Sequence, residues 1–336
     1  MKKIISPKIS VCIPVYETEP YLSLCLQSVL LQSFDSFEVI VLSDASNGRD
    51  FEGRKAEKIV NQITKLCNKT RKKNSQNPVS VQFLENENNR GIFEVRRTLC
   101  NFAKGEYLCF VDSDDRLADG ALETLYNAHL SSENVSYDII QGSSVSGTFD
   151  EEGNFNQAEK NLYSNITFGN LSGHEIFRTW LVEGNLTGIL WAKLLRRELV
   201  EQAYNQIPYT ECNMGDDILL FFFIAQLAKT YIGIEKCVYY YRINSGMSSE
   251  RKIDSLHKWQ LICSSASVFT IISENKNISD EESESLKRQA RTYLLSLLQK
   301  LKRNVVLQLQ EQAYEMLCEW WGKDFVESIK FVIKNQ

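Results

Sequence analysis

Three carboxylates lie within four residues at the end of one short apolar segment. The run Tyr107 to Val111 is rich in aromatic and β-branched residues and predicts a buried strand. The acids that follow it are Asp112, Asp114 and Asp115. Carboxylates this close raise one another's pKa, so a site that keeps them charged usually supplies a cation. Asp112 and Asp114 can both turn toward one Mg²⁺ or Mn²⁺ ion, which would leave most of its coordination shell free for a diphosphate.

The same stretch has a simpler interpretation as a turn ahead of a helix. Asp is a common helix N-cap, and a helix that begins near Arg116 would be capped by this cluster. The residue types of the stretch therefore leave both interpretations open, and the flanking elements decide between them.

Strands and helices are predicted to alternate ahead of the acidic cluster. The strands are expected at 9–16, 38–42, 79–84 and 107–111. This alternation predicts an α/β fold with a Rossmann-like, mostly parallel sheet flanked by helices, whose ligands bind beyond the carboxyl ends of the strands. Tyr16, Asp44 and the acidic cluster all follow such ends. We therefore expect them to converge.

The pattern becomes less regular after the fourth strand. Residues 142–170 are rich in Ser, Gly and Asn and have mixed strand and loop character. Gly215-Asp216-Asp217 precedes an apolar helix at 218–228, and the chain from Ser255 onward is expected to be helical. These patterns predict an α/β domain at 1–250 and a helical C-terminal extension at 251–336.

The composition argues against some partners and compartments. The net charge of the 336-residue chain is −5, which disfavours a nucleic-acid partner held by bulk electrostatic attraction. Nine cysteines without a C-x-x-C pair favour reduced thiols in a cytoplasmic protein over a disulfide scaffold or a zinc site. No signal peptide is expected at the N-terminus, and no apolar run is long enough to span a bilayer.

The motifs, taken in order, resemble those of the inverting family 2 glycosyltransferases, which have the GT-A (nucleotide-diphospho-sugar transferase) fold. The resemblance covers residues 9–249, about three quarters of the chain. It is carried by Ser10-Val-Cys-Ile-Pro-Val-Tyr16, Ser43-Asp44-Ala-Ser, Asn89-Arg-Gly91 with Arg96, Gly105 to Asp115, Trp191-Ala-Lys-Leu and Gly215-Asp-Asp-Ile. Each motif is weak alone, but the order and the separations are specific.

The resemblance implies a donor site at the first two strand ends. Pro14 and Tyr16 would form the floor under the nucleobase, for which an aromatic face is suitable. Asp44 would accept a hydrogen bond from uracil, although Ser43 replaces the first of the two acids that the family usually has there. The alternatives are a tyrosine packed at a strand end and an aspartate that caps a turn.

Further donor contacts are implied along the chain. Arg96 would lie near the donor, although Arg97 stands where the family commonly has Asn, and a surface ion pair is the alternative. Trp191 would stack on a sugar ring or be buried at a helix start. The segment Arg242 to Ser249 would close over the diphosphate, with Arg242 facing phosphate.

The reaction itself would depend on two acidic motifs. Asp112 and Ser113 resemble donor-binding residues, and Asp114, together with Asp112, resembles the ligands of a Mn²⁺ or Mg²⁺ ion. Asp217 resembles the catalytic base, with Asp216 as the second candidate; a plain helix start is the alternative for both. An inverting transfer needs one base that takes the acceptor hydroxyl proton, opposite a cation that neutralises the leaving diphosphate.

The resemblance implies transfer of a single sugar from a UDP-sugar to a glycan or lipid-linked saccharide acceptor in surface polysaccharide assembly. A processive synthase is disfavoured because Gln-x-x-Arg-Trp is absent from the sequence. A sugar nucleotidyltransferase would have a Gly-rich loop where Tyr16-Glu17 stands, and an Asp-x-Asp phosphatase would carry its acids after the first strand. A non-catalytic nucleotide-sugar-binding module would need no Asp217.

The helical tail has three interpretations. A stripe of leucines shares one predicted helix with several basic residues, and it consists of Leu294, Leu297, Leu298 and Leu301. The stripe favours packing on the α/β domain with the charges in water. The alternatives are peripheral docking on an anionic membrane at the inner face of the plasma membrane and a homodimer through the C-terminal helices.

Overall fold

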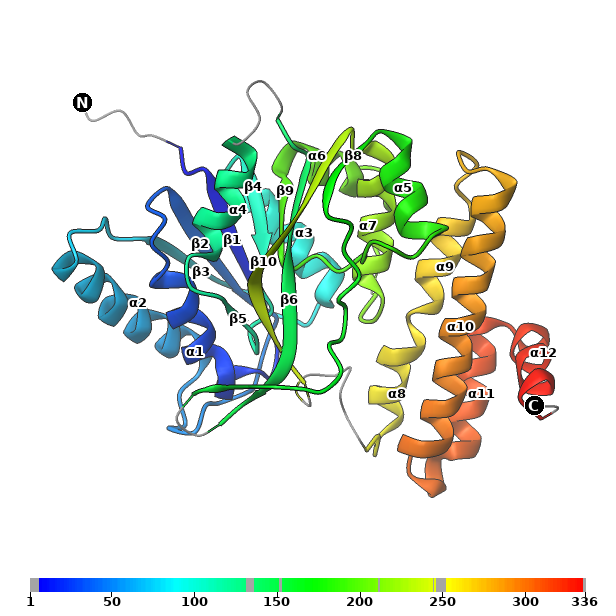
Figure 1. The fold of residues 1–336 in the computed structure, drawn as a ribbon. Coiled ribbons are helices and arrows are strands. Elements are labelled where there is room, and N and C mark those ends of the chain that lie inside the picture. Colours follow the sequence, from blue (N-terminus) through cyan, green and yellow to red (C-terminus); the bar gives the residue numbers. More distant parts are fainter. Residues whose placement is uncertain are drawn as a thin grey trace.

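A large mixed sheet with helices on both faces forms the body of the molecule, and further helices pack at one end of it (Figure 1). The computed structural model describes residues 6–130, 136–150, 153–210, 212–243, 245 and 252–334. The strands are β1 Ile9–Val15, β2 Phe37–Ser43, β3 Ser80–Glu85, β4 Tyr107–Phe110, β5 Arg116–Leu117, β6 Ile139–Phe149, β7 Phe155–Gln157, β8 Gly169–Ser172, β9 Lys193–Arg196 and β10 Thr230–Arg242. Their order is β3-β2-β1-β4-β9-β6-β10-β5, with β7 beside β6 and β8 beside β10.

The first four strands form the parallel half of the sheet. β1 pairs in parallel with β2 and β4, and β2 pairs in parallel with β3. β1 and β2 are buried almost throughout, which explains why both are continuous apolar runs rather than alternating ones. The register places Val15 opposite Ser43. The residues that follow β1, β2 and β4 therefore lie at one edge of the sheet, as the sequence predicts.

A reversed strand joins the two halves of the sheet. β9 runs antiparallel to β4 and to β6, whereas β6 and β10 run parallel to each other. Because β9 is antiparallel to β4, the residues that precede β9 lie beside those that follow β4. This reversal brings Trp191 to the edge that carries Asp112.

Helices cover both faces of the sheet (Figure 1). The helices α1 Glu19–Leu30, α2 Ala56–Lys73 and α4 Ala121–Leu130 share one hydrophobic core, and α3 Ile92–Phe102, α6 Arg197–Tyr204 and α7 Asp216–Leu227 contribute to the other. α2 is amphipathic and buries only one stripe. α7 is apolar around its circumference and is buried from Leu219 to Ala225, because it lies between the sheet and the C-terminal helices.

Two local expectations are changed by the structure. The acidic turn leads into the short strand β5, and α4 begins only at Ala121, so the cluster does not cap a helix near Arg116. Thr18 precedes α1 as expected, but its side chain makes no cap hydrogen bond. Its hydroxyl instead lies 2.6 Å from the Ser113 hydroxyl and ties the start of α1 to the acidic turn.

The C-terminal helices share a core with the sheet. They are α8 Leu256–Cys263, α9 Ala266–Ser273, α10 Asp280–Asn304, α11 Gln310–Trp321 and α12 Lys323–Lys334, and α10 packs beside the earlier helix α5 His174–Leu181. α10 begins at a capping box of Ser279 and Glu282. Leu294, Leu297 and Leu298 are buried in the same cluster as α7. The domain boundary predicted between 250 and 251 falls outside the described residues.

The buried surface also bears on the cysteine and membrane expectations. All nine cysteines are free, and seven of them are buried. Within the described ranges, no helix combines the length and the apolar character needed to cross a bilayer.

Arg71 supports the N-terminal half of the fold. Its side chain is fully buried in α2. The guanidinium donates to the carbonyl oxygens of Leu30 at 3.2 Å, Gln32 at 2.5 Å and Asn77 at 2.6 Å, and to the Asp35 carboxylate at 2.6 Å. One side chain therefore joins α2 to the connection between α1 and β2.

We predict that Arg71→Met lowers the free energy of unfolding by about 3 kcal/mol, because several buried acceptors lose their donor. Urea denaturation followed by circular dichroism measures this loss. Lys72→Met, at the exposed neighbouring position, is the matched control and should change stability by less than about 0.5 kcal/mol. Equal stability of the two variants would contradict the assigned role.

Candidate active site

A large cavity of about 700 Å³ opens at the carboxyl ends of the parallel strands. The side chains or backbone of ten predicted site residues line it. These are Pro14, Tyr16, Asp44, Arg96, Asp112, Ser113, Asp114, Trp191, Asp216 and Asp217. Segments far apart in sequence therefore meet in one space, as the positions of the strand ends led us to expect. Of the predicted donor-binding residues, Arg242 does not line this cavity.

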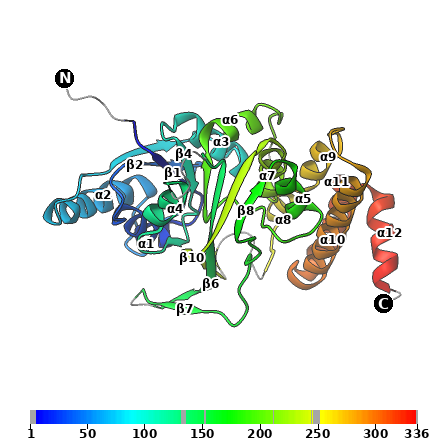
Figure 2. The same cartoon turned by 45° about the horizontal axis from the view of Figure 1, so that its top comes forward.

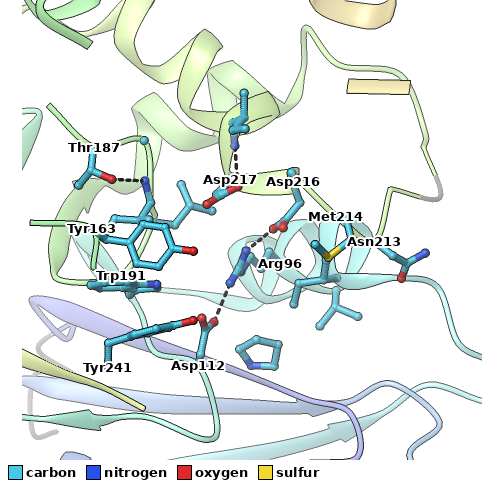
Figure 3. A pocket seen from close by; sticks show the side chains of 18 of the residues that line it. Arg96, Asp112, Tyr163, Thr187, Trp191, Asn213, Met214, Asp216, Asp217 and Tyr241 are labelled. Atoms are coloured by element: carbon cyan, nitrogen blue, oxygen red, sulfur yellow. Dashed lines mark hydrogen bonds and ion pairs between the residues drawn. The ribbon is translucent and has the colours of Figure 1, made fainter. Parts of the chain in front are cut away.

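Arg96 connects the two acidic motifs (Figure 3). Its guanidinium donates to Asp112 Oδ1 at 2.6 Å and also forms an ion pair with Asp216. The side chain is buried, on α3, with its guanidinium carbon 6.0 Å from the centre of the Phe110 ring. Arg96 thus faces the cavity rather than forming the surface ion pair that was the alternative. One buried cation holds the turn after β4 against the start of α7.

Asp217 lies beside this ion-pair network at the start of α7. Gly215, the N-cap, has a φ of 80°, a left-handed conformation that glycine adopts without strain and that turns the chain into the helix. Burial, followed by the charge of Asp216, raises the pKa of Asp217 to about 7, while Arg96 opposes the rise. A carboxyl with this pKa exchanges a proton readily near neutral pH, which suits a general base.

The acids after β4 divide into two groups. Asp112 and Asp114 line the cavity, whereas the buried Asp115 accepts hydrogen bonds from the Tyr239 hydroxyl at 2.9 Å and from the Arg242 backbone N–H at 2.7 Å. Burial, followed by Asp112, raises the pKa of Asp114 to about 6. Asp115 therefore anchors the turn to β10, and Asp112 and Asp114 remain directed at the cavity.

The residues present fit a hard divalent cation. The side chains of this turn that line the cavity, Asp112, Ser113 and Asp114, offer oxygen atoms, which are the ligands that Mg²⁺ and Mn²⁺ prefer. The two carboxylates carry more negative charge than Arg96 neutralises. No cluster of three or more His, Cys, Asp and Glu side chains suited to a metal occurs in the part of the chain that the structure describes. Asp112 and Asp114 would supply part of the coordination shell of such a cation and leave the rest to a ligand.

Asp44 has a structural task as well as a place in the cavity. Its carboxylate accepts hydrogen bonds from the backbone N–H of Arg90 at 2.9 Å and of Gly91 at 3.0 Å, and from the Asn86 amide at 2.7 Å. Gly91 has a φ of 80°, and a Cβ there would lie 2.9 Å from Asn213 Oδ1. Asp44 thus fixes the loop before α3, as expected for an aspartate that caps a turn, which was the alternative to uracil binding. The uracil contact stays a prediction.

Trp191 belongs to an aromatic cluster rather than standing free. Its ring is stacked on that of Tyr241, with centroids 5.3 Å apart, and lies perpendicular to the ring of Tyr163 at 5.8 Å (Figure 3). It is also stacked on Tyr239, with centroids 4.6 Å apart. Only 4% of Trp191 is exposed. Ala192 turns the chain after it with a φ of 57°. Trp191 is therefore buried, as the alternative expected, but it precedes the strand β9 and not a helix, so that part of the expectation was wrong. Stacking on a sugar stays a prediction.

Arg242 braces the acidic turn from outside the cavity. Its Nε donates to the Asp114 carbonyl oxygen at 2.9 Å, and its guanidinium lies over the rings of Tyr21 at 4.5 Å and Phe149 at 4.6 Å. Of the predicted closing segment Arg242 to Ser249, residues 244 and 246–249 lie outside the described part of the chain. Arg97 donates to carbonyl oxygens at the end of α6 and just after it.

Several cavity residues were not predicted. They include Tyr163, Thr187, Asn213, Met214, Tyr241, Gln289 and Tyr293. Tyr163 lies in an irregular segment with a φ of 55° and is 47% exposed, and nothing in the local sequence marks it. The sequence did contain a usable signal for Tyr241. Tyr239 and Tyr241 are two residues apart in a predicted extended segment, so their rings are expected on the same face of the strand.

A comparison with models of protein families shows to which family the chain belongs. The family model "Glycosyl transferase family 2" matches residues 10–202, which is more than half of the chain. The chain belongs to glycosyl transferase family 2. The matched range includes the turns after β1, β2 and β4, Arg96 and Trp191, and it ends before Asp216 and Asp217.

Relatives of this family 2 protein include several bacterial glycosyltransferases. Glycosyltransferase GlyA of Streptococcus pneumoniae is 29% identical over 257 residues, 73% of this chain and 32% of GlyA. Glycosyltransferase GlyG of the same organism is 24% identical over 258 residues, 74% of this chain and 75% of GlyG. The chain thus spans about a third of GlyA and three quarters of GlyG. The poly(ribitol-phosphate) beta-N-acetylglucosaminyltransferase TarP of Staphylococcus aureus is 31% identical over 187 residues, 53% of this chain and 51% of TarP.

Solved structures confirm the fold expected of the family. The crystal structure of S. aureus TarS 1-349 in complex with UDP-GlcNAc has a TM-score of 0.54 at 18% identity and covers 96% of this chain and 91% of TarS 1-349. The mannosyltransferase PcManGT from Pyrobaculum calidifontis in complex with GDP-Man and Mn²⁺ has a TM-score of 0.51 at 16% identity, covering 89% of this chain and 75% of that one. At these identities the likeness shows the GT-A fold alone.

The raised pKa of Asp217 gives a stability prediction. The pKa is about 7 in the folded protein against an ordinary value of 3.8, so the folded state binds this proton more tightly and loses stability as pH rises from 4 to 7. Asp217→Asn removes that loss. Because the titration is only half complete at the pKa, we predict that the variant gains about 4 kcal/mol relative to the parent between pH 4 and pH 8, with no further gain above that range.

Urea denaturation in EDTA at several pH values measures this difference. Asp324→Asn, at an exposed position of α12, is the control and should show no such pH dependence. A stability difference between parent and Asp217→Asn that is the same at pH 4 and pH 7 would show that Asp217 keeps an ordinary pKa.

Proposed function

We propose that the protein is a metal-dependent, inverting glycosyltransferase that moves one sugar from a UDP-sugar to a glycan or lipid-linked saccharide acceptor. One observation carries the proposal. Two carboxylates after β4 and a carboxyl with a pKa near neutrality at the start of α7 line the same cavity, with Arg96 between them. This is the charge distribution that a single in-line displacement needs, since base and leaving group act on opposite faces of the sugar.

The proposal gives each residue a role that suits its position. Asp217 takes the proton of the acceptor hydroxyl while that oxygen forms a bond to the anomeric carbon. The bond from that carbon to the diphosphate oxygen breaks at the same time, and UDP leaves with the electron pair. Asp216, paired with Arg96, orients the start of α7. When bound at Asp114 and Asp112, Mg²⁺ or Mn²⁺ would neutralise charge on the leaving diphosphate.

The donor end of the cavity is assigned to the turns after β1 and β2. Tyr16, with Pro14 and Asp44, lines the part of the wall that comes from these strands and offers a face for a planar base. The TarS complex with UDP-GlcNAc supports a uridine nucleotide, whereas the PcManGT complex contains GDP-Man. We propose UDP because Asp44 matches the uracil-binding position of the family motif.

Transfer of one sugar per encounter is part of the proposal. The processive motif Gln-x-x-Arg-Trp is absent from the sequence. The relative TarP, named as a poly(ribitol-phosphate) beta-N-acetylglucosaminyltransferase, supports a polymer as acceptor, and we propose a surface polysaccharide. The second candidate is a non-catalytic nucleotide-sugar-binding module, which would need the donor residues Pro14, Tyr16 and Asp44 but not Asp217. A variant of Asp217 therefore distinguishes the two functions. Membrane contact and a homodimer stay predictions.

The first prediction from this proposed function concerns the metal. UDP should bind the parent protein with Mn²⁺ or Mg²⁺ and at least about tenfold more weakly in EDTA, because Asp112 and Asp114 repel the diphosphate without a cation. Calorimetric titration measures both affinities. Asp114→Asn should lose the response to the metal, whereas Asp119→Asn, at an exposed position after the same turn, should keep it. Tight binding of UDP that is indifferent to EDTA would contradict the site.

The second prediction from this proposed function concerns the proposed base, Asp217. Asp217→Asn should lower the rate of UDP release from a UDP-sugar by about 10²- to 10⁴-fold while UDP affinity stays within about twofold. In the parent, kcat/KM should fall as pH drops below about 7, because Asp217 becomes protonated. Coupled detection of UDP gives the rates, and Asp324→Asn is again the control. Full turnover by Asp217→Asn would favour Asp216 or another group as the base.

A further inference from the structure

Helix α10 reaches the cavity from the C-terminal region, which no sequence motif connects with the site. Gln289 and Tyr293, about one turn apart on α10, both line the cavity, and both are partly exposed. Figures 1 and 2 show α10 on the far side of α7 from β1. The two side chains therefore form a wall away from the strand ends that supply the donor residues.

Specific contacts hold α10 in this position. Near its N-terminus, Glu281 pairs with Arg178 at 2.6 Å and the buried Glu282 lies 2.7 Å from His174, both partners being on α5. Further along, the Gln289 amide donates to the Leu181 carbonyl oxygen at 3.5 Å. α10 also buries its leucine stripe in the core that α7 shares. The wall is thus fixed relative to the catalytic cavity.

Tyr293 flanks the proposed base. Its hydroxyl oxygen lies 3.7 Å from the position that a Cβ on Gly215 would take, and Gly215 is two residues before Asp217. The ring packs against Phe269 at 5.6 Å and is stacked on Trp321 at 6.1 Å, so its orientation is set from behind. Burial, followed by the charge of Asp217, raises the pKa of Tyr293, which keeps the hydroxyl protonated as a hydrogen-bond donor.

The chemistry of the cavity lining suits a hydroxylated ring or polyol. The lining combines the phenol of Tyr293 and the carboxamide of Gln289 with the apolar side chains of Trp180, Leu186 and Met214. Such a mixture binds sugars, because the hydroxyl groups need hydrogen bonds and the C–H faces need apolar contact. In the displacement, the acceptor must approach Asp217 from the side away from the diphosphate. The diphosphate side is occupied by Asp112 and Asp114.

We propose that Gln289 and Tyr293 form the acceptor subsite, so that α10 belongs to the catalytic unit and selects the sugar or polyol unit that receives the new bond. The inference rests on the proposed glycosyl transfer. It assigns the C-terminal helices a role in specificity that does not depend on membrane contact or dimerisation.

The test separates the KM of the acceptor from that of the donor. UDP release is measured with Mn²⁺ and a UDP-sugar that the parent hydrolyses, chosen from UDP-glucose, UDP-galactose and UDP-N-acetylglucosamine. The acceptor probes are the methyl β-glycosides of glucose, galactose and N-acetylglucosamine, and ribitol 5-phosphate. Tyr293→Phe and Gln289→Ala are compared with Tyr314→Phe, whose hydroxyl bonds to Glu327 on α12, outside the cavity.

At least one probe should accelerate UDP release by the parent. For that probe, Tyr293→Phe and Gln289→Ala should raise the KM about tenfold, the loss expected for one hydrogen bond, with the donor KM within about twofold. Tyr314→Phe should match the parent. An unchanged acceptor KM in both variants, a parallel rise in donor KM, or no acceleration by any probe would overturn the assignment. Absence of both UDP binding and UDP-sugar hydrolysis in the parent would instead overturn the proposed function, and this inference with it.

Discussion

The structure depends on the burial of one guanidinium between two acidic segments that are more than a hundred residues apart. Arg96 holds Asp112 at the end of a sheet strand and Asp216 at the start of α7. A buried ion pair is costly to desolvate and is weak evidence of stability by itself. Its value here lies in position, because it fixes the distance between the turn after β4, where we propose that the diphosphate binds, and the end of α7 that carries the proposed base.

The surrounding residues make that arrangement specific. Asp115 is satisfied by Tyr239 and by the backbone of β10, which leaves Asp112 and Asp114 to face the cavity. Their combined charge exceeds that of Arg96, and burial raises the pKa of both Asp114 and Asp217. The charge repulsion between these carboxylates makes the cavity costly on its own and favours binding of a cation. The proposed nucleoside diphosphate would bind through that cation.

The sheet and the strand-end residues could be predicted because buried parallel strands have a simple signature. Continuous apolar runs indicated β1, β2 and β4, and chain direction then placed Tyr16, Asp44 and Asp112 at one edge. The contacts of these residues could not be predicted. Asp44 is engaged by the backbone of Arg90 and Gly91, a consequence of loop conformation rather than residue type. The position of Arg242 outside the cavity could not be predicted either, because the rings that it packs against, Tyr21 and Phe149, are distant in sequence.

Several residues that line the cavity could not be predicted at all. Tyr163 comes from an irregular segment, and Gln289 and Tyr293 lie on a helix whose pattern suggested core packing, membrane docking or a homodimer but no part in the cavity. Helical periodicity tells which face is buried, but not that part of the other surface completes a cavity built by residues far away in the sequence. Tertiary packing of α10 against α5 decides that, and no local signal encodes it.

The central claim is that Asp112 and Asp114 share one cation with the diphosphate of a bound nucleotide, across the cavity from Asp217. Anomalous scattering from crystals grown with UDP and Mn²⁺ tests it most directly. The account predicts a single Mn²⁺ at about 2.1 Å from an Asp114 carboxylate oxygen and from diphosphate oxygens. Clear density for UDP with no Mn²⁺ at this turn, or with its diphosphate outside the cavity that Asp217 lines, would contradict it.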